Sequence, residues 1–211
     1  RKRITIQLHQ RSEMLSGISH DLRTPLTRLK LQLSFLKQQD LAKKMSDDIE
    51  EMERMLNEYL EFARFQKNEE TETANLNDVI IKIVEKYQDK KININLEENL
   101  TINMRLNSFK RCLMNLIDNG LSYGKKVEIF TKKTLSNIII FVDDDGPGIP
   151  EKEHQNVMKP FYRIDKSRGQ NKSGVGLGLS IANDIIRSHG GNITLEKSYL
   201  NGLRVKISLP L

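Results

Sequence analysis

The sequence predicts two domains of different fold class: an all-α antiparallel helical hairpin at residues 1–67 and an α+β sandwich at residues 76–211. The first region carries apolar residues at steps of three and four, which is the period of an amphipathic helix. The second region alternates short strand-like segments with helix-like segments. Residues 68–75, between them, are polar and aperiodic, and we interpret them as a linker.

The composition favours a soluble protein with a modest core. Of the 211 residues, 37% are hydrophobic and 29% are charged, and no apolar run approaches the roughly 20 residues of a membrane span. The net charge is +6, but basic and acidic residues are interspersed, which favours a solvated surface over a nucleic-acid or membrane partner. The single Cys112 excludes an internal disulfide and fits a reducing compartment.

The first helix is expected from residue 1 to about residue 37. Its apolar stripe consists of Leu15, Ile18, Leu22, Leu26, Leu29, Leu33 and Leu36. His20 lies roughly 160° from the middle of that stripe and therefore faces solvent, with Thr24 one turn further on. Pro25 removes a backbone donor and leaves the carbonyl of Asp21 without its usual helical partner. The helix therefore bends beside an exposed His-Asp pair.

A histidine in this position can act as a nucleophile. Neutral imidazole attacks through one ring nitrogen, and Asp21 can accept a hydrogen bond from the other. The carboxylate would then fix the tautomer and stabilise the positive charge that builds on attack. An exposed histidine on a helix is, taken alone, usually a solvated surface residue, so this interpretation of His20 depends on the surrounding sequence.

A second helix is expected from residue 41 to about residue 67, after a short break at residues 38–40. Its apolar positions are Met45, Ile49, Met52, Leu56, Tyr59 and either Phe62 or Ala63. Two long helices joined by so short a break should be antiparallel neighbours. A lone hairpin cannot cover both stripes, so we expect a homodimer that forms a four-helix bundle. The alternative is a monomeric hairpin packed on the downstream domain.

The elements of the second domain follow from alternation and capping signals. We expect helices at residues 76–89, 107–122 and 176–189, and strands at residues 92–96, 101–104, 126–133, 137–143, 193–197 and 203–209. Asn75 or Asn77 can cap the first helix. The helices should cover one face of a mixed sheet. Residues 144–174 form a long glycine-rich loop with one short helix near Glu151, and a loop of this length in a small domain is most often functional.

Three segments of the second domain bear on ligand binding, and the first is the end of the helix at residues 107–122. Asn115 and Asn119 share one helix face, and a carboxamide oxygen is a hard neutral ligand suited to Mg²⁺. Tyr123 and the nearby Lys125 or Lys126 could reach phosphates. Two asparagines one turn apart are also common on an ordinary exposed polar face.

The second segment is Asp143 to Ile149, directly after an apolar strand. A carboxylate at a strand end can accept a hydrogen bond from an exocyclic amine such as that of adenine. The glycines allow the backbone to turn close against a flat ring. Asp-Gly-Pro-Gly is also an ordinary turn, and a cluster of carboxylates suits Ca²⁺ as well.

The third segment is the glycine run at residues 173–180, which opens a helix. Its glycines expose backbone N–H groups, and a helix N-terminus favours anions, so phosphates are natural ligands here. The run does not fit the dinucleotide fingerprint, because no strand directly precedes it. It is not a P-loop either, because no Gly-Lys-Ser/Thr follows.

Two parts of the chain resemble known families. Ser-His-Asp-Leu-Arg-Thr-Pro-Leu at residues 19–26 resembles the phospho-acceptor box of the sensor histidine kinases of two-component systems, and within them most of all the osmosensor (EnvZ-like) branch. The three later segments, in order and spacing, resemble the ATP-binding domain shared by histidine kinases, Hsp90-type chaperones, MutL-type repair proteins and type II topoisomerases. The resemblance spans about residue 12 to the end. Gly120 departs from it, because alanine is usual there and glycine costs some helix stability.

The resemblance implies a role for each matching residue. His20 would accept the γ-phosphoryl group of ATP, Asp21 would act as general base or orienting group, and Thr24 matches the position associated with phosphatase activity. Mg²⁺ would be bound by Asn119 and, less directly, by Asn115. Asp144 would recognise adenine. The remaining ATP-binding set would be Tyr123, Lys125, Lys126, Gly146, Gly148, Ile149, Phe161, Arg163, Gly174, Gly176, Leu177, Gly178 and Leu179. Residues 165–173 would be the mobile ATP lid.

The resemblance also implies partners and a cellular place. The phosphoryl group would pass from His20 to an Asp of a response regulator receiver domain, and phosphatase activity on the phospho-regulator is expected too. Because the chain opens on Arg-Lys-Arg-Ile without Met, we expect the cytoplasmic portion of a bacterial inner-membrane sensor. Within this chain we expect no contact with membrane or nucleic acid. Two alternatives stay open: an ATP-driven conformational clamp, and a pseudokinase scaffold without phospho-His.

Overall fold

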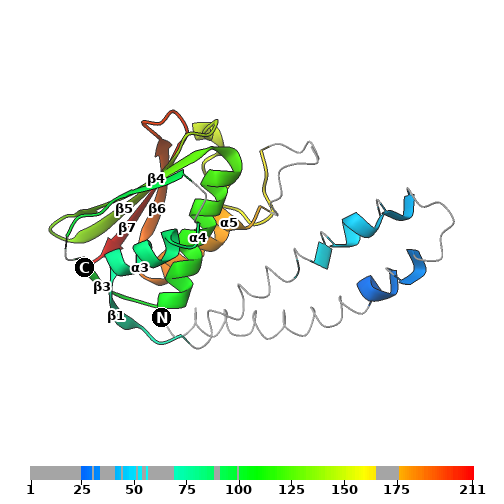
Figure 1. The fold of residues 1–211 in the computed structure, drawn as a ribbon, viewed down its shortest axis with the longest axis horizontal. Coiled ribbons are helices and arrows are strands. Elements are labelled where there is room, and N and C mark those ends of the chain that lie inside the picture. The colour runs from blue at the N-terminus through cyan, green and yellow to red at the C-terminus, as the bar shows by residue number, and fades with distance from the viewer. Residues whose placement is uncertain are drawn as a thin grey trace. The chain divides into compact units, whose positions relative to one another are not determined.

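The computed structural model describes residues 25–29, 31–33, 41–43, 45–50, 52–53, 56, 69–87, 91–98, 100–164 and 176–211. They belong to two compact units that divide between Asn68 and Glu69, and each unit is described by itself (Figure 1). The expected nucleophile and its neighbours, the expected lid and one glycine of the glycine run lie outside the described residues: His20, Asp21, Thr24, residues 165–173 and Gly174. Within the described part of the chain, no helix is long and apolar enough to cross a membrane.

The described residues of the first unit, between residues 25 and 56, are all helical. Their predicted stripes meet, because Leu26, Leu33 and Ile49 form one buried cluster against which Leu56 packs. Leu26 and Leu33 are two turns apart, so contact extends along the helix and is not confined to one point. This packing is what the spacing of apolar residues predicts.

Part of the same stripes stays at the surface of the single chain. Leu29 is 45% exposed, Met45 41% and Met52 54%. One hairpin therefore does not cover its own apolar residues, as expected for a unit that buries them against another surface.

The second unit is an α+β sandwich (Figure 1). In chain order its elements are β1 (Glu72–Asn75), α3 (Leu76–Val84), β2 (Lys91–Asn95), β3 (Thr101–Met104), α4 (Leu106–Tyr123), β4 (Lys126–Lys133), β5 (Asn137–Asp144), η1 (Glu151–Glu153), α5 (Gly178–Ser188), β6 (Asn192–Lys197) and β7 (Leu203–Pro210). The main sheet has the order β2-β4-β5-β7-β6, and β1 pairs with β3 in a separate ribbon. Only the β2–β4 pair is parallel among these pairings of described strands, so the sheet is mixed as predicted.

The helices cover one face of the main sheet (Figure 1). The alternation in β4 and β5 selects that face, because Val127, Ile129, Ile138 and Ile140 are fully buried. Buried residues of the helices complete the core: Leu76, Ile80, Ile83, Phe109, Leu113, Leu116, Ile117 and Ile186. Cys112 lies in the same layer, fully buried, and its thiol contacts the carbonyl oxygen of Ala182 at 3.8 Å.

Three boundaries differ from the sequence-based expectation by more than one residue. Residues 72–75, interpreted as linker, form β1, whose Thr73 hydroxyl donates to Asn103 Oδ1 at 2.6 Å. The strand was missed because its residues are polar and mostly exposed, so they carry no apolar alternation. Helix α3 ends at Val84 instead of near residue 89. Helix α5 begins at Gly178 because Gly176 has a φ of +78°, which no right-handed helix permits.

Candidate nucleotide-binding site

The candidate site begins with Asp144, the last residue of β5. This carboxylate is only 6% exposed. Its Oδ1 accepts hydrogen bonds from the backbone N–H of Gly146 at 2.8 Å and of Leu203 at 3.1 Å. Oδ2 accepts no hydrogen bond from the described residues, and it faces α4, since a Cβ on Gly120 would lie 3.9 Å from it. Asp144 therefore has one oxygen fixed and one acceptor available to a ligand.

Burial gives this carboxyl an unusual affinity for protons. Desolvation raises the pKa of Asp144, and the nearby charges of Asp145 and Asp143 raise it further. The two backbone hydrogen bonds oppose this effect but do not cancel it. A hydrogen-bond donor on a ligand would stabilise the ionised form of this carboxyl group.

The two neighbouring carboxylates accept hydrogen bonds from other residues of the second unit. The Asp143 carboxylate accepts hydrogen bonds from Nε of Arg204 at 2.8 Å and from Nη2 of the same side chain at 2.7 Å. Asp145 Oδ1 accepts the backbone N–H groups of Lys125 at 2.6 Å and Lys126 at 2.9 Å, which lower the pKa of its carboxyl. Among the described residues, no group of three or more His, Cys, Asp or Glu side chains could hold a metal ion. The acidic run is therefore not organised as a Ca²⁺ site.

Two glycines let other backbone segments approach Asp144. A Cβ on Gly120 would come within 2.8 Å of the Val127 side chain, so the absence of a side chain lets α4 lie close to β4. A Cβ on Gly202 would overlap the carbonyl oxygen and Oδ1 of Asp144. Sequence reasoning did not single out Gly202. Asn201-Gly202, between two strands, is nonetheless a hairpin-turn signal that could have pointed to it.

Of the two glycines in the second segment, Gly146 lies beside Asp144 and Gly148 lies beside Gly202. Gly146 also packs on the end of α4, because a Cβ there would be 3.1 Å from the carbonyl oxygen of Tyr123. Gly148 has a φ of +71°, a conformation that favours glycine. Ile149 is half-buried, and its carbonyl oxygen accepts from His154 Nε2 at 3.0 Å.

The two ends of the loop that contains the expected lid are joined to each other. The backbone N–H of Phe161 donates to the carbonyl oxygen of Gly176 at 3.0 Å. A Cβ on Gly176 would lie 2.8 Å from the carbonyl oxygen of Tyr162 and 3.3 Å from Cγ of Arg163. Phe161 is 53% exposed and has a φ of +64°, which is strained for a residue with a side chain. Residues 161–163 and the glycine run thus meet at this point.

The N-terminus of α5 lies beside Asn115. A Cβ on Gly178 would be 3.8 Å from the carbonyl oxygen and 3.9 Å from the Cβ of Asn115. Leu177, the N-cap residue, makes no side-chain capping bond. Nδ2 of Asn115 is buried and has no hydrogen-bond partner among the described residues. An uncapped helix N-terminus and an unsatisfied carboxamide thus lie together, an arrangement that suits a bound polyanion.

The donor set around Asn115 fits magnesium. Asn119 follows one turn later on α4 and is half-buried. Two neutral carboxamide oxygens suffice for Mg²⁺, which keeps several waters and takes its remaining ligands from phosphates. Two other groups of the candidate site contact α4 close to these asparagines. Asp144 lies next to Gly120, and the α5 N-terminus lies next to Asn115.

The other residues predicted to bind ATP differ from one another in how exposed they are. Tyr123 ends α4 and is 44% exposed, whereas Leu177 is only 3% exposed and belongs to the core; Leu179 is half-buried. Lys125 is exposed. The ammonium of Lys126 lies 2.5 Å from Glu128 Oε1, on the sheet face opposite the helices, because side chains alternate along β4. The structure therefore does not bring Lys126 to Asn115 and Asn119.

The chain matches two family models. Residues 104–211 match the family described as "Histidine kinase-, DNA gyrase B-, and HSP90-like ATPase", and residues 10–68 match the "His Kinase A (phospho-acceptor) domain". The second match contains His20, and the first contains every described residue of the candidate site.

Curated proteins and solved structures agree with the family models. The chain is 35% identical to the sensor histidine kinase GtrS of Pseudomonas aeruginosa over 99% of its length and 44% of that protein. It is 33% identical to the sensor histidine kinase CpxA of Escherichia coli over 94% of its length and 46% of that protein. The catalytic domain of the histidine kinase ThkA superposes on it with a TM-score of 0.56, 28% identity, and coverage of 67% of this chain and 95% of that one.

The chain therefore spans about half the length of the curated relatives it matches. These matches do not separate one branch of these kinases from another, so the osmosensor branch stays a prediction. The two domain matches and the sensor kinase relatives establish the family: the chain belongs to the sensor histidine kinases of two-component systems.

Proposed function

We propose that this chain is the catalytic core of an autophosphorylating protein-histidine kinase that transfers the γ-phosphoryl group of ATP to His20. One observation carries the proposal: a phospho-acceptor domain that contains His20 and an ATPase domain of the histidine kinase class occur in the same chain. A conformational clamp does not require a phospho-acceptor domain, and a scaffold without phospho-His does not require an ATPase domain.

The second unit would bind ATP through groups from three segments. Oδ2 of Asp144 accepts the exocyclic amine of adenine while Oδ1 stays bound to the backbone. Gly146 and Gly148 line the ring. The uncapped N-terminus of α5, with Gly176 and Gly178, receives the phosphates. Phe161 and Arg163 lie at the base of the loop that would close over them.

Magnesium is part of the proposal. The carboxamides of Asn119 and Asn115 would hold Mg²⁺, which offsets phosphate charge when it is bound. The chain's own residues then position the reactants: an imidazole nitrogen of His20 forms the N–P bond as the bond to the ADP oxygen breaks. Asp21 accepts a hydrogen bond from the other ring nitrogen and stabilises the imidazolium.

We further propose that the chain works as a homodimer with a response regulator as partner. The exposed Leu29, Met45 and Met52 support the dimer, because a second hairpin would cover them. The phosphoryl group on His20 would pass to an Asp of the regulator's receiver domain. Thr24, one turn from His20, would orient a water for the reverse phosphatase activity. In the full-length protein we expect a membrane anchor upstream, with this chain on the cytoplasmic side.

The test is incubation with γ-labelled ATP and Mg²⁺. The parent chain should acquire acid-labile, base-stable label, and His20→Gln and Asn119→Ala should acquire none, the first because it lacks the acceptor and the second because it lacks the metal ligand. Asn192→Ala is the matched control, because Asn192 is an exposed asparagine of β6 outside the site, and it should be labelled like the parent.

The alternatives give different results in the same assay. Label that survives His20→Gln would place the acceptor on another residue. Hydrolysis of ATP without label on the parent chain would indicate a conformational clamp. Binding without hydrolysis or label would indicate a pseudokinase scaffold.

A further inference from the structure

The sheet face opposite the helices carries an ion pair between a buried aspartate and a partly buried arginine. Asp143 and Arg204 are directly opposed in the register of β5 and β7. The Asp143 side chain is fully buried, and both of its oxygens accept from the guanidinium, at 2.8 Å from Nε and 2.7 Å from Nη2. The pairing is bidentate, and the planar fork of arginine, which lysine lacks, makes this geometry possible.

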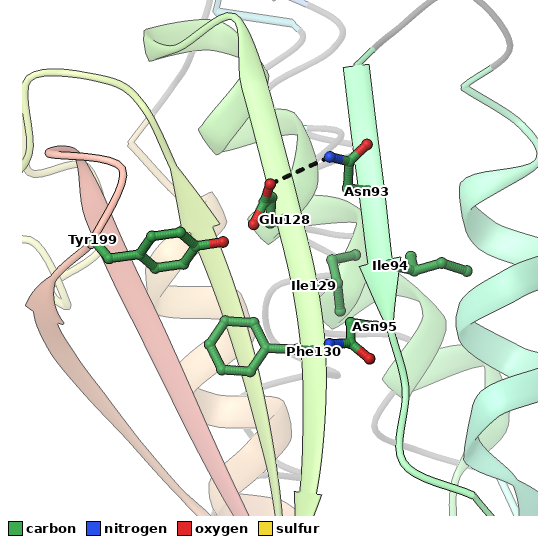
Figure 2. A pocket seen from close by; sticks show the side chains of 7 residues that line it. All are labelled: Asn93, Ile94, Asn95, Glu128, Ile129, Phe130 and Tyr199. Carbon is green, nitrogen blue, oxygen red and sulfur yellow. Dashed lines mark hydrogen bonds between the residues drawn. The ribbon is translucent and has the colours of Figure 1, made fainter.

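Aromatic rings hold the guanidinium from its other side. Phe130 and Phe141 stack with ring centroids 4.6 Å apart and an interplanar angle of 17°. Cζ of Arg204 lies 5.1 Å from each of these centroids and 5.7 Å from that of Tyr199. Figure 2 shows Tyr199 and Phe130 beside one another at the open pocket on this face. With two carboxylate bonds and three rings around it, the guanidinium has little freedom.

The residues next to this pair are the ones that hold Asp144. Asp144 follows Asp143 on β5, and Leu203, whose N–H binds Asp144 Oδ1, precedes Arg204 on β7. Gly202 packs directly against Asp144. Any slip between β5 and β7 at the Asp143–Arg204 pair would therefore move the Leu203 donor and turn the Asp144 carboxylate.

We propose that Arg204 is a positioning residue for adenine recognition: its bidentate pair with Asp143 fixes β5 against β7 so that Asp144 presents Oδ2 to the nucleotide. Arg204 touches no nucleotide itself and acts through Asp143 and the Leu203 N–H. A buried ion pair contributes little net stability compared with apolar residues of similar size, but its two-bond fork fixes relative position. The inference rests on the proposed role of Asp144 in ATP binding.

The test compares ATP with purine riboside triphosphate, which lacks the exocyclic amine, in the full chain. The parent should bind ATP about tenfold to a hundredfold more tightly than the analogue, because one hydrogen bond to a charged acceptor is lost. The double variant Asp143→Leu/Arg204→Met should fold, yet bind ATP no more tightly than the analogue. Its affinity for the analogue should equal that of the parent.

A second variant covers the case in which the double variant does not fold. Arg204→Lys keeps the cation but not the fork, and its preference for ATP should fall by several-fold while its thermal midpoint stays near that of the parent. Lys206→Met is the matched control, because Lys206 lies on the same face of β7, is half-buried and pairs with the exposed Glu196 at 3.6 Å. Its nucleotide preference should not change.

Three results would overturn the inference, each for its own reason. A folded double variant or Arg204→Lys that keeps the parent's preference for ATP would show that Arg204 is structural only. Equal loss of affinity for both nucleotides would indicate a general effect instead of adenine positioning. A parent chain without preference for ATP would refute the adenine role of Asp144, and that result is recognisable because it needs no variant.

Discussion

Three consecutive carboxylates in the second unit have three different environments, and only one is suited to bind a ligand. Asp143 is paired and Asp145 is held by backbone N–H groups, whereas Asp144 is buried with one oxygen available. Because the folded state raises the pKa of Asp144, its contribution to stability is fully present below the unfolded value near 3.8. That contribution is lost as the pH rises through the higher folded value. Burial of the Asp144 carboxyl therefore works against the stability of the fold as the pH rises.

Asp144→Asn should separate stability from binding. The carboxamide oxygen must take the place of Oδ1, since both neighbouring groups are donors, so the NH₂ group faces the amine of adenine and repels it. We expect ATP affinity to fall at least about tenfold. The thermal midpoint at pH 7 should be equal or higher, and the advantage should shrink as the pH falls towards 4. Calorimetry with ATP and thermal unfolding at both pH values measure this, and an unchanged ATP affinity would contradict it.

At the scale of the element, helix α4 is capped by a residue far away in sequence. The Glu69 carboxylate accepts a hydrogen bond from the backbone N–H of Asn107. It also accepts hydrogen bonds from the backbone N–H of Ser108 at 2.9 Å and from the Ser108 hydroxyl at 2.6 Å. Burial opposes its ionisation, but these hydrogen bonds, with the charge of Arg105, hold the pKa of Glu69 below its usual value. The N-cap residue, Arg105, makes no side-chain capping bond of its own.

Glu69→Ala should destabilise the second unit by about 1–2 kcal/mol at pH 7. Because the folded state lowers the pKa of Glu69, the stabilisation is present above its unfolded value of 4.5 and is lost as the pH falls through the folded value. The difference from the parent should therefore be smaller at pH 3 than at pH 7. Urea unfolding at both pH values tests this. Glu70→Ala, an exposed neighbour, is the control, and an equal effect of both substitutions would argue against the cap.

The elements that sequence reasoning found and those it missed differ in the range of the signals they depend on. The alternation of Val127 and Ile129 and the capping side chain of Asn75 are local, and they predicted β4 and the start of α3. The Glu69 cap joins residues 38 and 39 positions apart, and the Arg204–Asp143 pair joins residues 61 positions apart. No local pattern contains such contacts, so they emerge only once the fold brings the segments together.

The whole molecule has an apolar surface that a single chain leaves open. Leu29→Glu should convert a dimer to a monomer, because it places a charge on the part of the stripe that is 45% exposed in one chain. Light scattering after size exclusion measures the mass, and calorimetry should find ATP binding by the second unit unchanged. Leu31→Glu is the control, because Leu31 is 60% exposed and lies off the stripe. A dimer that survives both substitutions would place the interface elsewhere.

The burial of Cys112 has a practical consequence for testing whether residues 165–173 act as the proposed ATP lid. Its thiol is fully buried between α4 and α5, and burial raises its pKa, so the reactive thiolate is scarce in the folded chain. A maleimide dye should therefore react with a cysteine introduced at residue 165–173 and leave Cys112 intact. One fluorophore could then report the position of this segment while ATP is added, with the natural cysteine kept in the protein. Reaction of Cys112 itself would report unfolding.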